Sequence, residues 1–292
     1  MRIGVVDVGS NTTRLLVAEA ARGMLEPVRE ERVRLALGVD VERLGRISPT
    51  RLAAAASAVR RLVALARKLD ADPLEVVVTA PGRQAENADE LLSALRAAAR
   101  LPVRTVSAEE EGALSYRGAV SAAPELEGSV AVCDVGGAST ELAVGEVDGD
   151  PTWLRSVDVG AVRLTERLLG VEPRTSGAVE AAREEAERTF AVLVPPLPTT
   201  ALATGGCARA LRKVVGPTLG AAELLKAQRV LAELGPDEAA ERYKLDPNRA
   251  RILLAGALIL GAVQSRIVVP FGVARGGIRE GLAYELLLER AA

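Results

Sequence analysis

The residues best suited to phosphate chemistry lie between Val130 and Val147, in the stretch VAVCDVGGASTELAVGEV. An apolar run ends at Asp134, and two glycines, two hydroxyl residues and Glu141 follow it. Glycines allow backbone N–H groups to approach an anion closely, and hydroxyls add further donors. Carboxylates at the two ends of the turn can hold a divalent cation through oxygen or water. The pattern predicts a hairpin that binds phosphate and a cation; an ordinary glycine-containing β-turn is the alternative.

A second stretch of the same kind begins at Asp7. A short apolar run ends at Asp7, and the residues GSNTT begin two positions later. An alternating run then continues over Arg14–Ala20. A turn at Arg22-Gly23 then leads to a third predicted strand, about 25–37. DVGSNTT and DVGGAST each stand between an apolar run and an alternating run. The sequence therefore predicts two domains built from one duplicated plan, with two phosphate-binding hairpins facing each other.

Four further stretches place charges or glycines at the end of a predicted strand. Arg83, in TAPGR, can clamp a phosphoryl group with two hydrogen bonds, although a solvated surface arginine is the simpler interpretation of it alone. The glutamates at 109–111 open a helix, where they interact with the helix dipole or supply a general base. Gly205 and Gly206, in ATGGCARAL, form a strand-to-helix turn that suits a phosphate or nucleotide. GGIREG repeats this arrangement with Arg279, and the first turn of a helix is the simpler explanation there.

The chain contains no histidine and two cysteines, which narrows the chemistry. Catalysis through histidine is excluded, so a general base has to be Asp or Glu, or less commonly Lys or Tyr. Cys133 lies in an apolar run and is expected to be a small buried hydrophobe, whereas Cys207 follows a glycine pair and could line a site. Their number and spacing form neither a disulfide framework nor a zinc site.

Composition describes a globular protein large enough for two domains. Of the 292 residues 49% are hydrophobic, 26% are charged and only 2% are aromatic, so Val, Leu, Ala and Ile must build the core. A net charge of −2 predicts no nucleic-acid or membrane surface. The N-terminus lacks a signal peptide, and the longest apolar run, 252–263, is too short to span a membrane. A cytoplasmic location is therefore expected.

Strand and helix patterns alternate along the whole chain, which predicts the α/β class. Ser48 and Pro49 start a helix that reaches about residue 69, and Ser107 with Glu110 forms a capping box for another. The other expected helices are 86–100, 162–169, 175–193, 208–215, 221–234 and 247–263, and the other expected strands are 74–79, 102–106, 153–159, 201–204 and 266–269. A crossover at 121–128 predicts domains 1–122 and 123–292, with the last helix, about 278–290, able to pack back on the first domain.

The motifs, taken in order, resemble those of the exopolyphosphatase / guanosine pentaphosphate phosphohydrolase family, Ppx/GppA. They are DVGSNTTRLLV, VVVTAPGRQAEN, SAEEEGALSYRG, DVGGASTELAVG, VGAVRLTE and GGIREGL. The resemblance covers essentially the whole chain and implies the actin/Hsp70/sugar-kinase fold, with two ribonuclease-H-like α/β domains and an interdomain cleft. It implies hydrolysis of a terminal phosphoanhydride in polyphosphate or guanosine pentaphosphate, with Mg²⁺ (or Mn²⁺) required. Guanosine tetraphosphate is a further expected ligand, and because relatives are commonly dimeric, a homodimer is among the expected states.

The resemblance also implies roles for individual residues, carried over by position. Glu111 resembles the catalytic base that deprotonates water, and Arg83 resembles the arginine that clamps the phosphate chain. The implied metal-associated carboxylates are Asp7, Asp134 and Glu141. The implied phosphate-binding residues are Ser10, Asn11, Thr13, Arg14, Gly136, Gly137 and Ser139, to which the turn at Gly205 and Gly206 is added.

Departures from the family pattern bear on activity. The family loop is usually D-[IV]-G-G-G-S, and its third glycine is Ala138 here, whose Cβ could crowd a phosphate or require a different backbone angle. The usual Ala-Leu-Arg is Pro81-Gly82-Arg83 in this chain. Longer relatives carry a further C-terminal helical domain that is missing here, which favours short polyphosphate or a nucleotide 5′-triphosphate end as substrate.

Two alternatives to a hydrolase are open at this stage. An ATP-dependent kinase or ATPase of the same fold would need an adenosine pocket and an acceptor site, whereas the acidic triplet at 109–111 favours attack by water. A non-catalytic sensor of alarmone or polyphosphate would bind without releasing phosphate, and Ala138 is the residue that best supports it.

Overall fold

The computed structural model describes residues 1–21, 24–170 and 174–291, which form two compact units. The first unit contains Met1–Ala122 and Gly276–Ala292, and the second contains Ala123–Arg275. The predicted boundary after residue 122 coincides with this division. Residues 276–292, which the sequence assigned to the second domain, instead belong to the first unit. The reason is that α11 (Ile278–Ala291) packs against α5 (Ala108–Ser121) and β1 (Arg2–Val8), as the alternative placement of the last helix anticipated.

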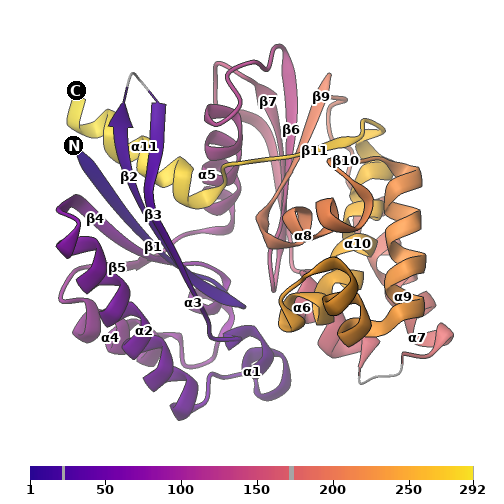
Figure 1. Ribbon diagram of the computed structural model, residues 1–292, viewed down its shortest axis with the longest axis horizontal. Helices are drawn as coiled ribbons and strands as arrows, with labels where there is room; N and C mark the ends of the chain where they lie inside the picture. Colours follow the sequence, from indigo (N-terminus) through magenta and orange to yellow (C-terminus); the bar gives the residue numbers. More distant parts are fainter. Residues whose placement is uncertain (22–23, 171–173, 292) are drawn as a thin grey trace. The chain divides into compact units, whose positions relative to one another are not determined.

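The sheet of the first unit has the order β3-β2-β1-β4-β5. β1 pairs antiparallel with β2 (Thr12–Ala21), which pairs antiparallel with β3 (Met24–Arg34). β4 (Ala71–Val78) and β5 (Val103–Thr105) continue the sheet in parallel with β1 (Figure 1). The turn predicted at Arg22-Gly23 lies outside the described residues. The carboxyl ends of the three parallel strands meet at one edge, where functional side chains are expected in an α/β sheet.

Helices cover both faces of this sheet because side chains alternate along its strands. Val6 and Val8 of β1 belong to a core with α2 (Pro49–Lys68) and α4 (Ala88–Ala99), whereas Ile3 and Val5 belong to a second core with α5 and α11. Ser48 caps α2 and Ser107 caps α5, as the sequence predicted. Two short helices, α1 (Leu37–Leu44) and α3 (Ala80–Gln84), were not predicted.

The second sheet repeats the plan of the first, in the order β10-β11-β9-β6-β7-β8. Its antiparallel strands are β6 (Ser129–Val135), β7 (Thr140–Glu146) and β8 (Pro151–Val157), and β9 (Thr200–Thr204) and β11 (Phe271–Val273) run parallel to β6. A short β10 (Thr218–Leu219) adds one edge. Taken from its other edge, the second sheet has the order β8-β7-β6-β9-β11, which corresponds strand by strand to β3-β2-β1-β4-β5 of the first. This match confirms the duplicated α/β plan.

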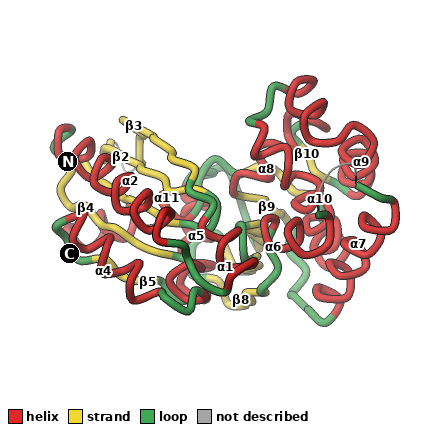
Figure 2. The backbone as a smooth tube through the Cα atoms, turned by 90° about the horizontal axis from the view of Figure 1, so that it is seen from below, coloured by secondary structure: helices red, strands yellow, loops and turns green. Residues whose placement is uncertain are grey.

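The second unit is built around one apolar helix, α10 (Pro247–Ile267). The helix is long and apolar enough to cross a membrane by length and composition, but 78% of its most apolar window is buried inside the protein. Figure 2 shows α10 among its neighbouring helices, which include α7 (Ser176–Ala191), α8 (Gly205–Val215) and α9 (Ala221–Tyr243). The strand predicted at 266–269 is wrong, because α10 continues through Ile267 and the strand is β11. α6 (Ala161–Leu164) and a π-helical turn (Thr165–Leu169) follow β8.

Glycines allow α11 to lie against α5, so a larger side chain at these positions is expected to disturb the packing of the two helices. A Cβ at Gly118 would lie 2.0 Å from the carbonyl oxygen of Gly277 and 2.6 Å from the amide nitrogen of Gly281. Because both neighbours are backbone atoms, the helices themselves would have to separate. We expect Gly118→Ala to lower the free energy of unfolding by about 1–3 kcal/mol, measured by urea denaturation.

Gly177→Ala is the matched control for this prediction. Gly177 lies in α7, and a Cβ there would meet no atom within 4 Å. Because alanine is the better helix former, this variant is expected to be neutral or up to about 1 kcal/mol more stable. A Gly118→Ala protein with the denaturation midpoint of the wild type would contradict the tight helix contact.

Candidate active site

The first candidate loop joins β1 to β2 and contains Ser10 and Asn11. Its carbonyl oxygens accept hydrogen bonds from the turn that precedes α1 and from the first turn of α1. The amide of Gly38 donates to the oxygen of Ser10 at 2.7 Å, and the amides of Leu35 and Ala36 donate to the oxygen of Asn11 at 3.1 and 3.0 Å. The element after the third strand therefore holds this loop through its backbone.

The second candidate loop joins β6 to β7 and is held in the same way by α6, the helix after β8. The oxygen of Gly136 accepts from the amide of Ala161 at 3.0 Å. The oxygen of Gly137 accepts from the amides of Val162 and Arg163 at 2.8 and 3.1 Å. The duplicated plan thus extends to the support of the loops, which the sequence comparison of the two hairpins did not reveal.

This support determines which way the loop amides point. In a trans peptide the carbonyl and the following N–H are directed to opposite sides. Because the carbonyls of Ser10, Gly136 and Gly137 are directed to a helix start, the N–H groups of Asn11, Gly137 and Ala138 are directed away from it. Successive backbone amides directed to one side are a known way of binding an anion.

Close approach of other backbone atoms, rather than an unusual backbone angle, favours glycine at Gly136 in the second loop and at Gly160 beside it. Neither they nor Ala138 are among the described residues with positive φ. A Cβ at Gly136 would lie 2.9 Å from the oxygen of Ser139, and one at Gly160 would lie 2.5 Å from the carbonyl carbon of Gly137. Ala138 is 4% exposed, so its methyl group is accommodated inside the unit without a left-handed backbone.

Arg83 and Glu111 form an ion pair at the carboxyl ends of β4 and β5. Nη2 of Arg83 donates to Oε2 of Glu111 at 2.8 Å, and Nη1 donates to the carbonyl oxygen of Val106 at 2.9 Å. The two side chains are only 19% and 12% exposed. The interpretation of Arg83 as a solvated surface residue is therefore wrong.

The three glutamates at the start of α5 have different environments. Glu110 completes the capping box, because its amide donates to Oγ of Ser107 at 3.0 Å and its carboxylate accepts from the amide of Ser107 at 3.4 Å. Glu110 also pairs with Arg104. Glu109 is exposed, and Glu111 is the member of the triplet that contacts Arg83. Capping therefore accounts for Glu110 but not for Glu111.

Asp134 and Glu141 lie opposite each other on β6 and β7. Glu141 is 2% exposed and accepts a hydrogen bond from Oγ of Ser156 at 2.8 Å. The backbone at Gly205 comes close to Asp134, since a Cβ there would lie 2.8 Å from Oδ1, and Gly205 adopts φ +87°. The structure thus brings the two carboxylates and the Gly205 turn together within the second unit. Gly206 follows in the first turn of α8.

The remaining predicted residues lie in the first unit around the β1–β2 hairpin. Asp7 is 8% exposed and pairs in register with Arg14. Thr13 is fully buried, and its hydroxyl has no hydrogen-bond partner among the described residues. Across the part of the chain that the structure describes, no group of three or more Asp, Glu, Cys or His side chains could hold a metal ion.

Sequence reasoning missed two residues beside these sites. Thr79 directly follows β4 and is 4% exposed, and its hydroxyl lies 3.8 Å from the position of a Cβ at Gly9. Its place at the end of an apolar strand was a usable signal. Ser156 could be found only from the register of β7 and β8, which the sequence does not show.

Several other candidates have structural roles. Arg279 donates to the carbonyl oxygen of Leu15 at 3.2 Å and to Glu30 at 2.8 Å, so it ties α11 to the first sheet. Cys207 is fully buried, and its sulfur accepts from Arg249 at 3.4 Å. Burial raises the pKa of the Cys133 thiol well above its usual value, and the neighbouring carboxylates raise this pKa further, so the thiol stays protonated and unreactive.

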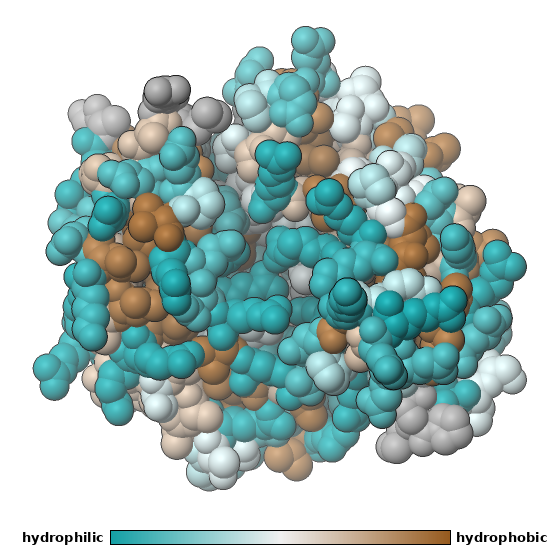
Figure 3. All heavy atoms as spheres, in the orientation of Figure 1, coloured by the Kyte–Doolittle hydropathy of each residue, from teal (hydrophilic) through white to brown (hydrophobic). Residues whose placement is uncertain are grey.

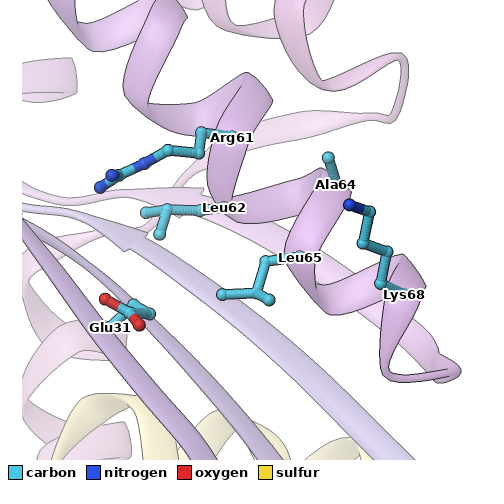
Figure 4. A pocket seen from close by; sticks show the side chains of 6 residues that line it. All are labelled: Glu31, Arg61, Leu62, Ala64, Leu65 and Lys68. Atoms are coloured by element: carbon cyan, nitrogen blue, oxygen red, sulfur yellow. The ribbon is translucent and has the colours of Figure 1, made fainter.

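A pocket of about 290 Å³ lies between β3 and α2 (Figure 4). Its walls combine apolar side chains with charged ones, and its lining residues are Glu31, Arg61, Leu62, Ala64, Leu65 and Lys68. None of the predicted site residues lines it, so this pocket is separate from the candidate site. Figure 3 shows hydrophilic side chains over most of the face drawn there, with hydrophobic patches between them.

Comparison with known proteins identifies the family. Residues 16–290 match the model of the Ppx/GppA phosphatase family. Exopolyphosphatase 2 of Mycobacterium tuberculosis is 30% identical, over 89% of this chain and 88% of that protein. A guanosine-5'-triphosphate,3'-diphosphate pyrophosphatase of Aeromonas salmonicida is also 30% identical, over 97% of this chain and 58% of that protein.

Solved structures agree with this assignment. The crystal structure of the Aquifex aeolicus member of the Ppx/GppA family superimposes with a TM-score of 0.85 at 25% identity, over 100% of this chain and 99% of that one. An exopolyphosphatase from Cytophaga hutchinsonii has the same fold, with a TM-score of 0.87 at 18% identity. The motifs, the two repeated sheets and these matches agree, and the chain belongs to the Ppx/GppA phosphatase family.

Proposed function

We propose that the protein removes the terminal phosphate from inorganic polyphosphate or from guanosine pentaphosphate. Its family and the names of its relatives support hydrolysis of a phosphoanhydride. The observation that carries the proposal is the contact between Arg83 and Glu111, because it pairs a carboxylate with a cation at the edge of the sheet where ligands bind. In a chain without histidine, this carboxylate is well suited to activate water.

In the proposed reaction Glu111 accepts the proton of the attacking water. Arg83 keeps the carboxylate oriented through the 2.8 Å hydrogen bond and is itself anchored on the carbonyl of Val106. A guanidinium has five N–H donors, so Arg83 retains donors for a phosphoryl oxygen. Phosphoryl transfer depends mainly on positioning and charge stabilisation, which this pair can provide.

The backbone amides of the two loops are proposed to bind phosphate oxygens. The N–H groups that point away from the supporting helices are that of Asn11 in the first unit and those of Gly137 and Ala138 in the second. The hydroxyls of Ser10, Thr13 and Ser139, the guanidinium of Arg14 and the turn at Gly205 and Gly206 are the other proposed contacts. Alanine at position 138 fits this loop without a left-handed backbone, so the third glycine of the family pattern is not required for its conformation here.

Asp134 and Glu141 are the proposed ligands of Mg²⁺ or Mn²⁺. Their carboxylates are hard oxygen donors on neighbouring strands, and Mg²⁺ is commonly bound by one or two carboxylates together with substrate phosphates and water. The donor set therefore fits the ion. When bound, the ion would neutralise charge on the phosphate oxygens. Ser156 orients Glu141, and Asp7 is proposed as its counterpart in the first unit.

Phosphate release tests the proposal. The purified protein is incubated with Mg²⁺ and polyphosphate of graded length, guanosine pentaphosphate or ATP, with and without sugar or carboxylate acceptors. We expect phosphate release from polyphosphate or guanosine pentaphosphate that needs no acceptor. Acceptor-dependent formation of ADP would instead show a kinase, and binding of polyphosphate or guanosine tetraphosphate without release would show a sensor.

A further inference from the structure

The loop at Ser10 and Asn11 depends on a turn with an unusual backbone. Ala36 in this turn adopts φ 52° and ψ 42°, a left-handed conformation that is unfavourable for a residue with a Cβ. The turn directs the amides of Leu35 and Ala36 to the carbonyl oxygen of Asn11. The conformation of the turn therefore sets the orientation of the loop.

Arg51 of α2 holds the other side of the same turn. Its Nη1 donates to the carbonyl oxygen of Leu35 and, at 2.8 Å, to that of Ala36. Its Nε lies 2.7 Å from Oδ1 of Asp40, whose Oδ2 accepts from the amide of Ser48 at 2.9 Å. Two successive carbonyls thus converge on Nη1 of one guanidinium, and its Nε is held by a carboxylate that is only 11% exposed.

We propose that Arg51 is a positioning residue for phosphate binding. The inference rests on the proposed function of the loop, which Arg51 does not itself contact. By neutralising the two convergent carbonyl dipoles, the guanidinium keeps the turn left-handed at Ala36. The amides of the turn then hold the carbonyl of Asn11, and the peptide groups of the loop stay oriented for an anion. Without Arg51 the turn relaxes, and the loop loses its preorganisation.

A related arrangement recurs in the second unit. Arg163 is 8% exposed, and its Nη1 donates at 2.7 Å to the carbonyl oxygen of Asp158, in the turn between β8 and α6. That turn precedes the helix that holds the carbonyls of Gly136 and Gly137. An arginine therefore anchors the supporting turn behind each loop, with a partly exposed side chain in the first unit and a buried one in the second. This recurrence favours a positioning role over a chance surface contact.

Arg51→Met is the test variant, and Arg67→Met is the matched control. Arg67 lies on the same helix and also donates to two successive carbonyls, those of Ala99 at 3.1 Å and Arg100 at 3.5 Å, where Arg100 is left-handed with φ 53°. Arg67 has no contact with the turn before α1. A loss of helix anchoring alone would affect the two variants equally.

The dissociation constant of tripolyphosphate is measured by calorimetry, and KM and kcat are measured on polyphosphate. We expect Arg51→Met to raise the dissociation constant and KM about tenfold, the effect of losing a charge-assisted hydrogen bond, with kcat within about twofold of the wild type. Arg51→Lys should recover part of the affinity, because an ammonium can reach one carbonyl. Arg67→Met should leave both constants unchanged.

Unchanged tripolyphosphate affinity in folded Arg51→Met would overturn the inference, as would an equal loss in Arg67→Met. If Arg51→Met does not fold, Arg51→Lys and Asp40→Asn supply the same comparison, and wild-type affinity in both would overturn it. The proposed function is judged separately. A wild type that releases no phosphate refutes the hydrolase, while a loss of tripolyphosphate affinity confined to the Arg51 variants still supports the positioning role.

Discussion

Replacing Glu111 with glutamine is expected to lower kcat for phosphate release by about 10²–10⁴-fold, the usual contribution of a general base. The amide has nearly the shape of the carboxylate and keeps an oxygen that can accept the hydrogen bond of Arg83, but it cannot take a proton from water. KM should change little, because the proposed phosphate contacts are untouched. Steady-state kinetics on polyphosphate measure both constants.

Glu109→Gln is the control for this prediction. Glu109 stands in the same helical turn, is exposed and has no contact with Arg83 in the described structure. Replacing this carboxylate should leave kcat within about twofold of the wild type, because the side chain is exposed and does not contact Arg83. The change should also leave the helix intact, since an exposed charge in a first helical turn contributes only weakly to helix stability. A Glu111→Gln protein with nearly wild-type kcat would remove Glu111 from the mechanism.

Asp134→Asn is expected to raise the Mg²⁺ concentration for half-maximal activity by at least about tenfold. Loss of an outer-shell partner of a metal ligand already costs about 10–100-fold in affinity or activity, and loss of a ligand should cost no less. Because Glu141 lies opposite on β7, some binding should persist. Activity is measured as a function of Mg²⁺ concentration at fixed substrate.

Two further variants test whether the shift in Mg²⁺ dependence is specific to the pair of carboxylates at Asp134 and Glu141. Ser156→Ala removes the hydrogen bond to Glu141 and should produce a smaller shift in the same direction. Glu146→Gln, at the exposed end of β7, should leave the Mg²⁺ dependence unchanged. An Asp134→Asn protein with the Mg²⁺ dependence of the wild type would exclude Asp134 as a ligand.

The features that were predicted from the sequence are those with local signals. The two hairpins are encoded by an apolar run, a glycine turn and an alternating run, each within about twenty residues. Ser48 with Pro49 marks the start of α2, and Ser107 with Glu110 marks the start of α5. The duplication was visible because DVGSNTT and DVGGAST recur in the same context.

The features that were not predicted depend on contacts between distant segments. Arg83 pairs with Glu111, 28 positions away, and neither residue alone indicates the pair. The strand at 266–269 was misplaced because α10 continues past the polar residues at 264–266 as far as Ile267 and ends only at a left-handed Val268. The placement of α11 depends on glycines of α5 and α11 that let two backbones approach.

Oxygen transfer from water tests the central claim most directly. Polyphosphate is hydrolysed in H₂¹⁸O under single-turnover conditions, and the released phosphate is analysed by mass spectrometry. We expect one ¹⁸O atom in each phosphate released by the wild type, and loss of this labelled product in Glu111→Gln at the same enzyme concentration. Phosphate without label, or labelled phosphate formed equally fast by Glu111→Gln, would contradict attack by water activated by Glu111.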